Sequence, residues 1–451
     1  MTLPVVSLEH LSAELEAGRV SSRELVEACL ARIADPAGEG ARVYIRVDAE
    51  DARRAADEID EARARGERTR RYAGIPVSIK DLFDIEGQVT TAGSVVLAGS
   101  APAARDAAAV ARLREAGFII IGRSNMTEFA YSGLGLNPHY GTPRNPYDRQ
   151  AGRIPGGSSS GAAISVTDGM AAVGLGTDTG GSCRIPAALT GLTGFKPTAS
   201  RVPATGAFPL STTLDSIGGI GFTVNCCAIV DAILSSDPVY LSERAPLAGL
   251  RIGVPQTVVL DGMDRHVADT FQAALRRLSQ AGAQVADVPF AEFGELADIN
   301  AKGGFTAAES YPLHRAMLAR HGDQYDPRVK VRIEKGAQLT PADVAELRAR
   351  RTDWIRRTGR HFEELDLIAC PTVPTIAPTL AELDDDGAYG RINLLMLRNP
   401  TFINFLDGCA ISLPCHEPGT APVGLMLAAT QGQDRRLLAM ARSVEALLAA
   451  R

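Results

Sequence analysis

An excess of positive charge is missing from this 451-residue sequence, in which 47 basic residues stand against 53 acidic ones. The net charge of −6 gives no basic footprint for nucleic acid. No uninterrupted apolar run is long enough to span a bilayer. The N-terminal stretch lacks the basic leader, apolar core and small-residue cleavage site of a signal peptide. We therefore expect a cytoplasmic protein that binds neither nucleic acid nor a membrane.

Metal-ligand spacing is missing as well. The seven cysteines and seven histidines are scattered along the chain, so the sequence predicts no metal site and favours reduced thiols. Lysine is also scarce, because only five of the 47 basic residues are lysine, at positions 80, 196, 302, 330 and 335. Each retained lysine is therefore a candidate for a particular role.

The composition is that of a globular protein with a sizeable core: 45% of the residues are hydrophobic, 22% are charged, and the mean hydropathy is near zero. Residues 74–81 and 118–122 are rich in β-branched residues and predict strands, with an amphipathic helix over 106–116 between them. This alternation is typical of an α/β fold with a central sheet.

The second half of the chain predicts a new unit from about residue 247. Strands are expected at 250–255 and 284–288, with a helix over 267–281 between them, followed by a largely helical run to 364. Strands at 367–372, 409–414 and 424–428 then return to the main sheet, residues 377–389 predict an exposed loop, and a last helix covers 434–449. We thus divide the single domain into a core (1–246), a smaller helical insertion that caps the site (247–364) and a C-terminal completion of the sheet (365–451).

Two small-residue clusters lie in the stretch 152–197. Residues 156–161 read GGSSSG and residues 178–182 read DTGGS. Paired glycines directly before serines suit a backbone whose N–H groups approach a ligand, which indicates an oxyanion site with a hydroxyl nucleophile beside it. The alternative is a pair of glycine-rich connectors over a packed core.

Lys80 ends the apolar strand GIPVSIK. Burial would favour the neutral amine and lower the pKa of this lysine, which would make it a base. Alternatively, Lys80 extends to solvent from a strand edge or pairs with Asp81 or Asp84.

Together, Lys80, Ser158 and Ser182 resemble the Lys, Ser, Ser triad of the amidase signature family. The matching text is GIPVSIKD at 74–81, PGGSSSG at 155–161, GLGTDTGGSCRIPAA at 174–188 and GFKPT at 194–198. The resemblance is strong from about residue 72 to 220 and looser towards the ends. It implies a mixed central sheet covered by helices on both faces.

The resemblance also implies the chemistry. Ser182 would attack an amide carbonyl, and Ser158, which follows a cis peptide in the family, would relay the proton to neutral Lys80. The N–H groups of Thr179, Gly180, Gly181 and Ser182 would form the oxyanion hole. A small amide would be the substrate, no cofactor or metal would be needed, and a homodimer is a candidate because related proteins commonly dimerise.

Three departures from the family pattern leave these groups in place. Cys183 replaces an aliphatic residue, Cys226 replaces a frequent aspartate, and Ser160 replaces a glycine.

Substrate-binding candidates follow from position. Residues 125–130 follow a strand at its carboxyl end, where ligands of α/β sheets bind. Met126 and Thr127 there, with Gly157 beside the first serine, are the candidates. Further residues that could face the acyl pocket are Tyr311, Arg320, Arg398 and Asn404.

Three rival functions remain. Residues 157–161 also match the G-x-S-x-G nucleophile elbow, with Ser159 central. Residues 174–180 could be the turn of an NAD(P)-binding oxidoreductase. Within the family, the A subunit of a glutamyl-tRNA amidotransferase complex, a glutaminase, shares the core and the text NMTEFA at 125–130, although residues 394–427 look more like stand-alone amidases.

Overall fold

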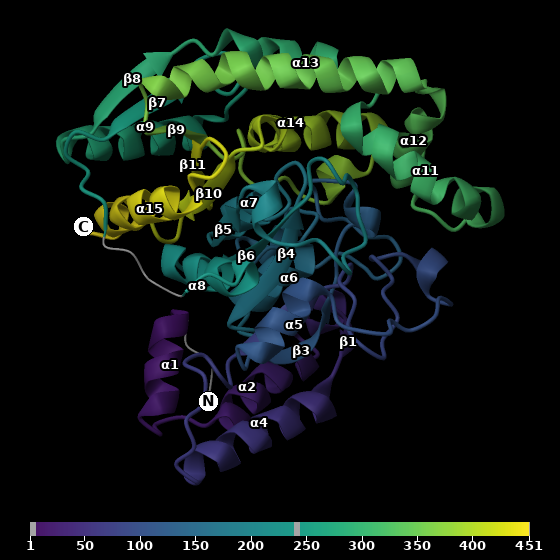
Figure 1. The fold of residues 1–451 in the computed structure, drawn as a ribbon, viewed down its shortest axis with the longest axis vertical. Coiled ribbons are helices and arrows are strands. Elements are labelled where there is room, and N and C mark those ends of the chain that lie inside the picture. The colour runs from purple at the N-terminus through teal and green to yellow at the C-terminus, as the bar shows by residue number, and fades with distance from the viewer. Residues whose placement is uncertain (1–5, 239–243, 451) are drawn as a thin grey trace.

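A computed structural model describes residues 6–238 and 244–450 (Figure 1). One sheet of eleven strands runs through the molecule in the order β1-β3-β2-β4-β6-β5-β10-β11-β9-β7-β8. The strands are Tyr44–Val47 (β1), Pro76–Lys80 (β2), Ile119–Ser124 (β3), Val173–Asp178 (β4), Thr193–Lys196 (β5), Ser216–Gly221 (β6), Arg251–Pro255 (β7), Gln284–Val288 (β8), Leu367–Pro371 (β9), Cys409–Pro414 (β10) and Gly424–Ala429 (β11).

The sheet is mixed, as predicted. Strand β2 pairs in parallel with both β3 and β4, and β7 pairs in parallel with β8 and β9. Antiparallel pairs join β4, β6, β5, β10, β11 and β9 in the centre. The carboxyl ends of β2 and β4 therefore meet at the same edge of the sheet.

Helices cover both faces of this sheet. On one face α6 and α7 pack on the central strands, with α2 and α4 over β3, while α8 and α15 pack on the other. The first eight helices are Leu8–Glu16 (α1), Ser22–Ala34 (α2), Gly40–Val43 (α3), Ala49–Ala64 (α4), Ala108–Glu115 (α5), Ser160–Thr167 (α6), Arg184–Thr190 (α7) and Val224–Ser235 (α8). The others are Arg265–Gln280 (α9), Leu296–Ile299 (α10), Gly304–His321 (α11), Pro327–Glu334 (α12), Pro341–Gly359 (α13), Asp386–Leu406 (α14) and Asp434–Ala449 (α15).

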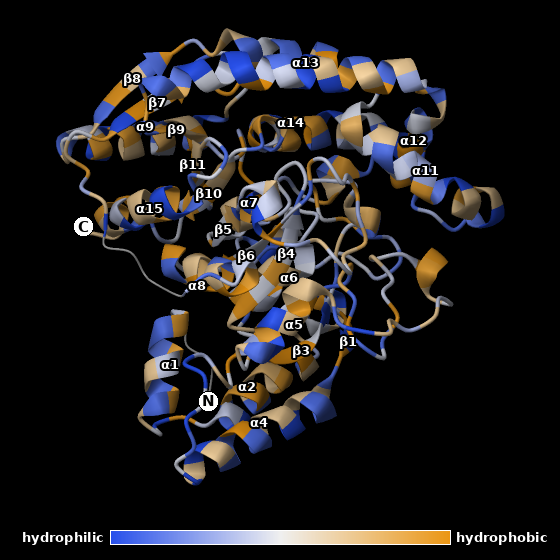
Figure 2. Cartoon of the chain, in the orientation of Figure 1, coloured by the Kyte–Doolittle hydropathy of each residue, from blue (hydrophilic) through white to orange (hydrophobic). Residues whose placement is uncertain are grey.

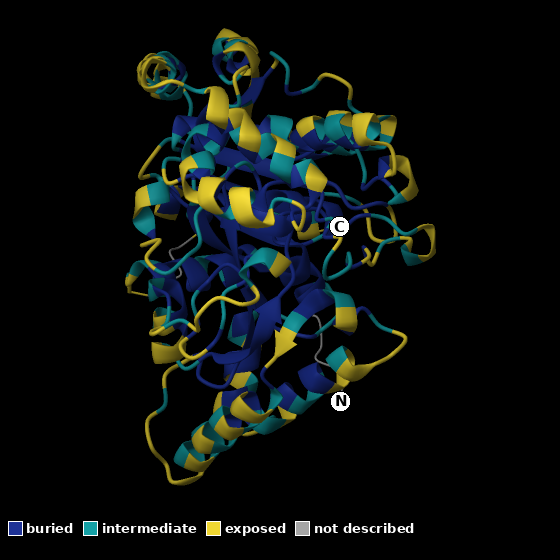
Figure 3. Cartoon of the chain, turned by 90° about the vertical axis from the view of Figure 1, so that its right-hand side faces the viewer, coloured by how far each residue is buried: buried dark blue, intermediate teal, exposed yellow. Residues whose placement is uncertain are grey.

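The burial pattern follows this layering. Central strands such as β2, β4 and β6 are buried along their whole length, and Figure 3 shows a buried interior with exposed residues on the helices around it. Outer helices such as α4 and α13 alternate hydrophilic and hydrophobic residues (Figure 2), which is the pattern of a helix with one face on a core. In the described part of the chain no helix is long and apolar enough to cross a membrane.

Residues 247–364 begin with two strands of the main sheet. Strand β7 pairs with β9, and β8 forms the edge beyond it. The helical run follows as α10–α13. In Figure 1, α13 lies above α14, with α11 and α12 at one side, and Trp354 of α13 is fully buried against Phe293 and Phe405.

The prediction of an exposed loop over residues 377–389 is wrong in part. Helix α14 begins at Asp386, capped by the Asp385 carboxylate, which accepts from Ala388 N. Tyr389 is 2% exposed, and its hydroxyl donates to Ser132 Oγ at 2.9 Å. Acidic residues that suggested a loop form the cap and first turn of a helix.

Candidate active site

Lys80 lies at the carboxyl end of β2, between the two parallel neighbours of that strand. Its side chain is 0% exposed, and its Nζ donates to Ser158 Oγ and Thr177 Oγ1, both at 2.8 Å. Burial lowers the pKa of Lys80 to about 8, because a charged amine is costly away from water. About a tenth of Lys80 is therefore uncharged at pH 7 and able to accept a proton, whereas an ordinary lysine is almost wholly charged there.

Asp81 does not pair with Lys80, which removes one alternative role for that lysine. The Asp81 carboxylate instead accepts from Arg123 Nε at 2.6 Å, and both side chains are buried. It also accepts from Gly93 N at 2.9 Å. The neighbouring carboxylate is thus neutralised by an arginine, and Lys80 is left to the two hydroxyls.

The two glycine-serine clusters lie beside each other. The peptide between Gly157 and Ser158 is cis, as the family resemblance implies. The Ser159 N–H donates to Ser182 O at 3.3 Å, which joins the first cluster to the second. Ser158 is therefore held by Lys80 through its side chain and lies next to Ser159, which binds the backbone of Ser182.

The second cluster folds around the buried carboxylate of Asp178. Its oxygens accept from Gly181 N at 2.9 Å and Cys183 N at 3.1 Å. Arg184 Nη2 also donates a hydrogen bond to Asp178 Oδ1 at 2.8 Å. Burial acts to raise the pKa of Asp178, but the charge of Arg184 outweighs it and holds the pKa well below its usual range. Residues 178–183, called the nucleophile loop after the role predicted for Ser182, thus rest on a buried ion pair.

Glycine is required at position 181. Its φ is +122°, in the region that favours glycine. A Cβ atom there would lie 2.6 Å from Pro400 Cβ and 2.7 Å from Ile185 Cδ1. The backbone of this loop is therefore packed directly against α14 and α7.

The predicted oxyanion donors differ in their availability. Gly181 N–H already donates to Asp178. The N–H groups of Thr179, Gly180 and Ser182 form no backbone or side-chain hydrogen bond with another residue in the described ranges. The Thr179 hydroxyl donates to Asp215 Oδ1 at 2.5 Å, which fixes the start of the loop. Three N–H groups thus remain free to meet a developing oxyanion.

A cavity of about 660 Å³ opens onto this loop and is lined by Thr179, Gly180 and Ser182. Its other walls come largely from α14, α10 and α11. Apolar side chains dominate these walls, among them Leu214, Phe293, Leu296, Phe305 and Phe402. A mostly apolar pocket with a few polar groups at one wall is the usual form of a small-molecule site.

The three predicted substrate-binding residues lie behind the cavity wall. Met126 and Thr127 are 0% exposed, and neither they nor Gly157 are among the residues that line the cavity. Thr127 N–H donates to Ser158 O at 3.1 Å, so this segment supports the first cluster. The residues that follow the carboxyl end of β3 are therefore buried in the protein interior and do not face the cavity.

Of the four acyl-pocket candidates, Arg398 lines the cavity and Tyr311, Arg320 and Asn404 do not. Asn404 is buried beneath the nucleophile loop instead. Its Nδ2 donates to Asp178 Oδ1 at 2.9 Å, and its Oδ1 accepts from Arg184 Nη2 at 2.6 Å. Asn404 therefore braces the loop.

Sequence reasoning missed Thr177 and Asp215. Thr177 accepts a hydrogen bond from Lys80. Alternate residues of a strand share a face, so the position of Thr177 two residues after apolar Leu175 was the one feature of the sequence that could have indicated an inward side chain. Burial raises the pKa of Asp215 to about 6. Asp215 lies in residues 204–220, a Gly/Ser/Thr-rich segment that follows the two clusters, and no motif there distinguishes it.

Two of the rival functions do not fit this geometry. Ser159, the central serine of an elbow, is buried and donates to Thr177 O at 3.3 Å, and no strand directly precedes it. A dinucleotide turn requires a helix that opens at Gly180, but α7 begins at Arg184, and β5 after it pairs only in antiparallel fashion, with β6 and β10.

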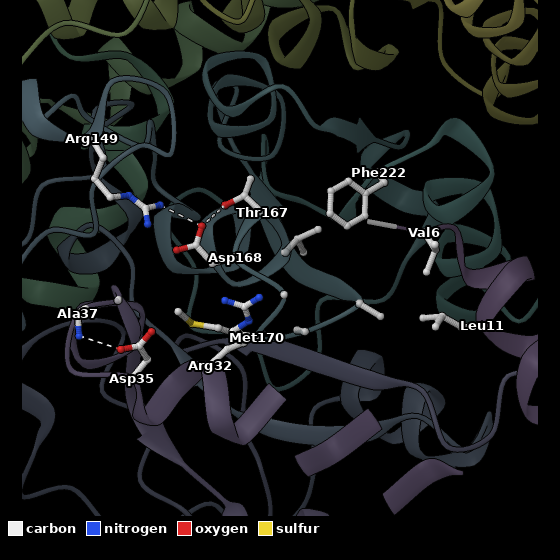
Figure 4. Close-up of a pocket in the computed structure, with 15 residues that line it drawn as sticks. Val6, Leu11, Arg32, Asp35, Ala37, Arg149, Thr167, Asp168, Met170 and Phe222 are labelled. Carbon is white, nitrogen blue, oxygen red and sulfur yellow. Dashed lines mark hydrogen bonds and ion pairs between the residues drawn. The ribbon is translucent and has the colours of Figure 1, made fainter. Parts of the chain in front are cut away.

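A second cavity, of about 370 Å³, lies away from the triad (Figure 4). Arg149 Nη2 donates to Asp168 Oδ1 at 3.0 Å on its wall. None of Lys80, Ser158 and Ser182 lines it. Within residues 6–238 and 244–450, no cluster of three or more histidine, cysteine, aspartate or glutamate residues is arranged to hold a metal ion.

This arrangement can perform nucleophilic acyl chemistry. A neutral amine has two N–H groups and one lone pair. If Lys80 donates one hydrogen to Thr177, its lone pair is available to the Ser158 hydroxyl. A buried base, a hydroxyl relay and free N–H donors beside a second serine are the parts that such catalysis needs.

Comparison with known proteins gives a consistent result. A family model described as Amidase matches residues 24–438. The 2-amino-5-chloromuconic acid deaminase of Comamonas testosteroni is 36% identical over 454 residues, covering 97% of this chain and 96% of that protein. The A subunit of the glutamyl-tRNA(Gln) amidotransferase of Roseiflexus sp. (strain RS-1) is 35% identical over 470 residues, covering 96% and 94%. A crystal structure described as that of an amidase superposes with a TM-score of 0.88 at 30% identity, covering 98% of this chain and 99% of that one.

Proposed function

This chain belongs to the amidase family of amide-hydrolysing enzymes, and from that premise we propose that it cleaves a small carboxylic amide through a Ser182 acyl-enzyme. The observation that carries the proposal is the contact of buried Lys80 with Ser158, at 2.8 Å between Nζ and Oγ. A base with its pKa lowered to about 8 and a hydroxyl within reach are what a serine nucleophile requires.

In the acylation step, Ser182 Oγ bonds to the carbonyl carbon while its proton passes to Ser158 Oγ. The Ser158 proton passes in turn to the lone pair of Lys80 Nζ. The carbonyl oxygen becomes an oxyanion, which the N–H groups of Thr179, Gly180 and Ser182 stabilise. Each such donor contributes roughly 3–4 kcal/mol to the transition state.

Collapse of this intermediate breaks the C–N bond, and the proton returns through Ser158 to the leaving nitrogen. The products of this half are ammonia or an amine and an ester of Ser182. Water then attacks the ester carbon and gives its proton to the same relay, and Ser182 Oγ leaves with a proton. The net reaction consumes one water and yields a carboxylic acid.

The relatives support an enzyme that acts alone and also one that acts in a complex. The Comamonas relative is described as a deaminase of 2-amino-5-chloromuconic acid, a small molecule. The Roseiflexus relative is described as part of a glutamyl-tRNA amidotransferase, in which the same site would act on glutamine. We favour the stand-alone amidase because the acidic net charge of −6 gives no sign of tRNA contact.

The test is ammonia or amine release from a panel of aliphatic, aromatic and dipeptide amides and glutamine. The Ser182→Ala protein serves as control, with its fold checked by circular dichroism. The proposal predicts release by the wild type and none by the variant. Glutamine hydrolysis that needs a co-purifying partner protein would favour the amidotransferase, and full turnover by folded Ser182→Ala would refute the acyl-enzyme.

A further inference from the structure

The cavity at Ser182 carries positive charge in a protein whose net charge is negative. Four cationic residues line it, and no aspartate or glutamate does among the described residues. The four are Arg332, Lys335, Arg391 and Arg398. The chain as a whole has 53 acidic and 47 basic residues, so the excess of positive charge is local to the cavity.

Three of these cations have no carboxylate partner in the described part of the chain. The side chains of Arg391 and Lys335, both exposed, form neither a hydrogen bond nor an ion pair there. Arg332 Nη1 donates to Tyr131 O at 2.6 Å, and its guanidinium lies 5.2 Å from the Tyr389 ring centre. Its positive charge is therefore not neutralised.

Neighbouring cations that do not line the cavity are neutralised in the ordinary way. Arg328 on the same helix, α12, pairs with Asp386 at 2.7 Å. Lys330 lies 3.9 Å from Glu334. The unpaired state of Arg332 thus distinguishes the cavity-facing side of this helix.

Arg398 has a different role. Its three guanidinium nitrogens donate to Val259 O, Asp261 O and Asn399 Oδ1, at 2.7–2.9 Å. These bonds fasten α14 to the loop after β7. We therefore assign charge recognition to Arg332, Lys335 and Arg391.

Helix α14 sets the distance between these cations and the nucleophile loop. A Cβ on Gly180 would lie 3.2 Å from Thr401 Oγ1 and 3.5 Å from Leu397 Cδ2, so the C-terminal half of α14 flanks the loop. Arg391 is ten residues before Thr401, which is about 15 Å along the helix axis. Arg328 pairs with Asp386 and so places α12, with Arg332, at the same distal end.

Apolar side chains fill the interval. Leu394 and Leu397 of α14, with Phe305 of α11, line the cavity. The cations and the nucleophile loop line the same cavity. Leu394 is 71% exposed, although it lies on the cavity side of the helix. A ligand that spans the cavity would cover this leucine.

We infer that the substrate is an amide whose acyl part ends in a carboxylate, such as the monoamide of a dicarboxylic acid. This inference rests on the proposed function. Ser182 would attack the amide end, an unbranched apolar segment would lie along Leu394 and Leu397, and Arg391, Lys335 and Arg332 would bind the carboxylate. Arg391 and Lys335 are exposed and Arg332 is half-buried, so the carboxylate would bind at the open end of the cavity through charge-assisted hydrogen bonds.

Kinetics on matched substrates test the inference. Primary monoamides of linear C6–C12 dicarboxylic acids are compared with the neutral linear amides of equal length. We expect kcat/KM to favour the carboxylates by about tenfold or more at the best length, and the preference to decline as salt is added. Arg391→Gln should remove most of it through a higher KM, whereas Lys330→Gln, which removes one charge from α12 outside the cavity, should leave it unchanged.

Equilibrium binding separates this inference from the proposed mechanism. Titration calorimetry of Ser182→Ala with the free dicarboxylic acids should show binding that Arg391→Gln weakens about tenfold. Hydrolysis of neutral amides equal to that of the monoamides, with no binding of the diacids, would overturn the inference and leave the amidase standing. Diacid binding without hydrolysis of any amide would overturn the proposed function instead.

Discussion

At the residue scale, the pKa of Lys80 gives the enzyme a defined pH dependence. Burial lowers this pKa to about 8, and in the proposed mechanism only the neutral amine accepts the Ser158 proton. The neutral fraction rises with pH, so kcat/KM should increase through an apparent pKa of about 8 and level off above it. A pH–rate profile from pH 6 to 10, with folding monitored at each pH, tests this. A profile that falls across pH 7–9 would contradict the role of Lys80.

Lys80→Ala removes the base itself. General-base catalysis contributes about 10²–10⁴-fold to rate, so turnover should fall by at least that factor while the protein stays folded. Measured kcat of Lys80→Ala and Ser158→Ala, with thermal unfolding as the control, tests the relay. Wild-type kcat in either folded variant would rule that residue out.

Thr177 positions Lys80 through the hydrogen bond to its Oγ1. Thr177→Val keeps the shape but removes the acceptor, and an ammonium loses more from this than a neutral amine because charge-assisted bonds are stronger. We expect kcat to fall about tenfold and the pKa of the rate profile to move below that of the wild type. Thr177→Ser, which keeps the hydroxyl, should restore both quantities, and a lower rate with an unmoved pKa would indicate a structural role alone.

The sequence alone was enough to propose the triad, because Lys80, Ser158 and Ser182 each stand in short, distinctive text. It could not identify the partners that hold them. Asn404 is 226 positions from Asp178, with which it shares a hydrogen bond, and one sequence carries no record of that contact. The sequence could not show that Met126 and Thr127 are buried, because their burial also depends on contacts between distant parts of the chain.

At the scale of elements, Asn404 couples α14 to the nucleophile loop. Asn404→Leu has similar volume but leaves Arg184 and Asp178 each short of a hydrogen-bond partner, and such loss costs about 1–3 kcal/mol per buried group. For the two groups together we expect the free energy of unfolding to fall by about 2–6 kcal/mol and kcat to fall with it. Urea unfolding and kcat measure the two effects.

A double-mutant cycle with Arg184→Met controls this prediction. Breaking the buried Asp178–Arg184 pair alone should cost about 3–5 kcal/mol, because it leaves an uncompensated charge. Residues in one network are not additive, so the double variant should lose less stability than the sum of the single losses. Strict additivity would show that Asn404 and Arg184 act separately.

Helix α14 was the element least accessible to sequence reasoning. It contains glycines at 387 and 390 and a proline at 400, which lower intrinsic helix propensity. Tertiary packing overrides that preference: Pro400 lies against Gly181, and Tyr389 and Met396 are buried. The strands predicted at 74–81 and 118–122 and the helix predicted at 106–116, whose periodicity and burial agree, lie within a few residues of β2, β3 and α5.

At the scale of the whole molecule, all seven cysteines are free, and six are buried. Burial raises the pKa of Cys183, Cys370 and Cys415 to about 12, so their reactive thiolate is scarce at neutral pH. Native protein should resist iodoacetamide and keep its activity, and denatured protein should take up seven labels by mass spectrometry. Inactivation that follows labelling of Cys183 would contradict this.

The α/β class and mixed sheet follow from the sequence and its family resemblance, but the order of the eleven strands does not. Strands β7 and β8 were predicted, yet local patterns do not encode that β7 pairs with β9 across more than a hundred residues. One continuous sheet crosses both predicted boundaries, at 246 and 364. The sheet therefore does not mark the division, which remains a prediction.

The central claim is that Ser182 becomes acylated. Rapid acid quench of enzyme mixed with a turned-over amide, followed by peptide mass mapping, measures this directly. The account predicts an added acyl mass on the peptide that contains Ser182, absent from Ser182→Ala. An active enzyme whose acyl group maps to another residue would contradict it.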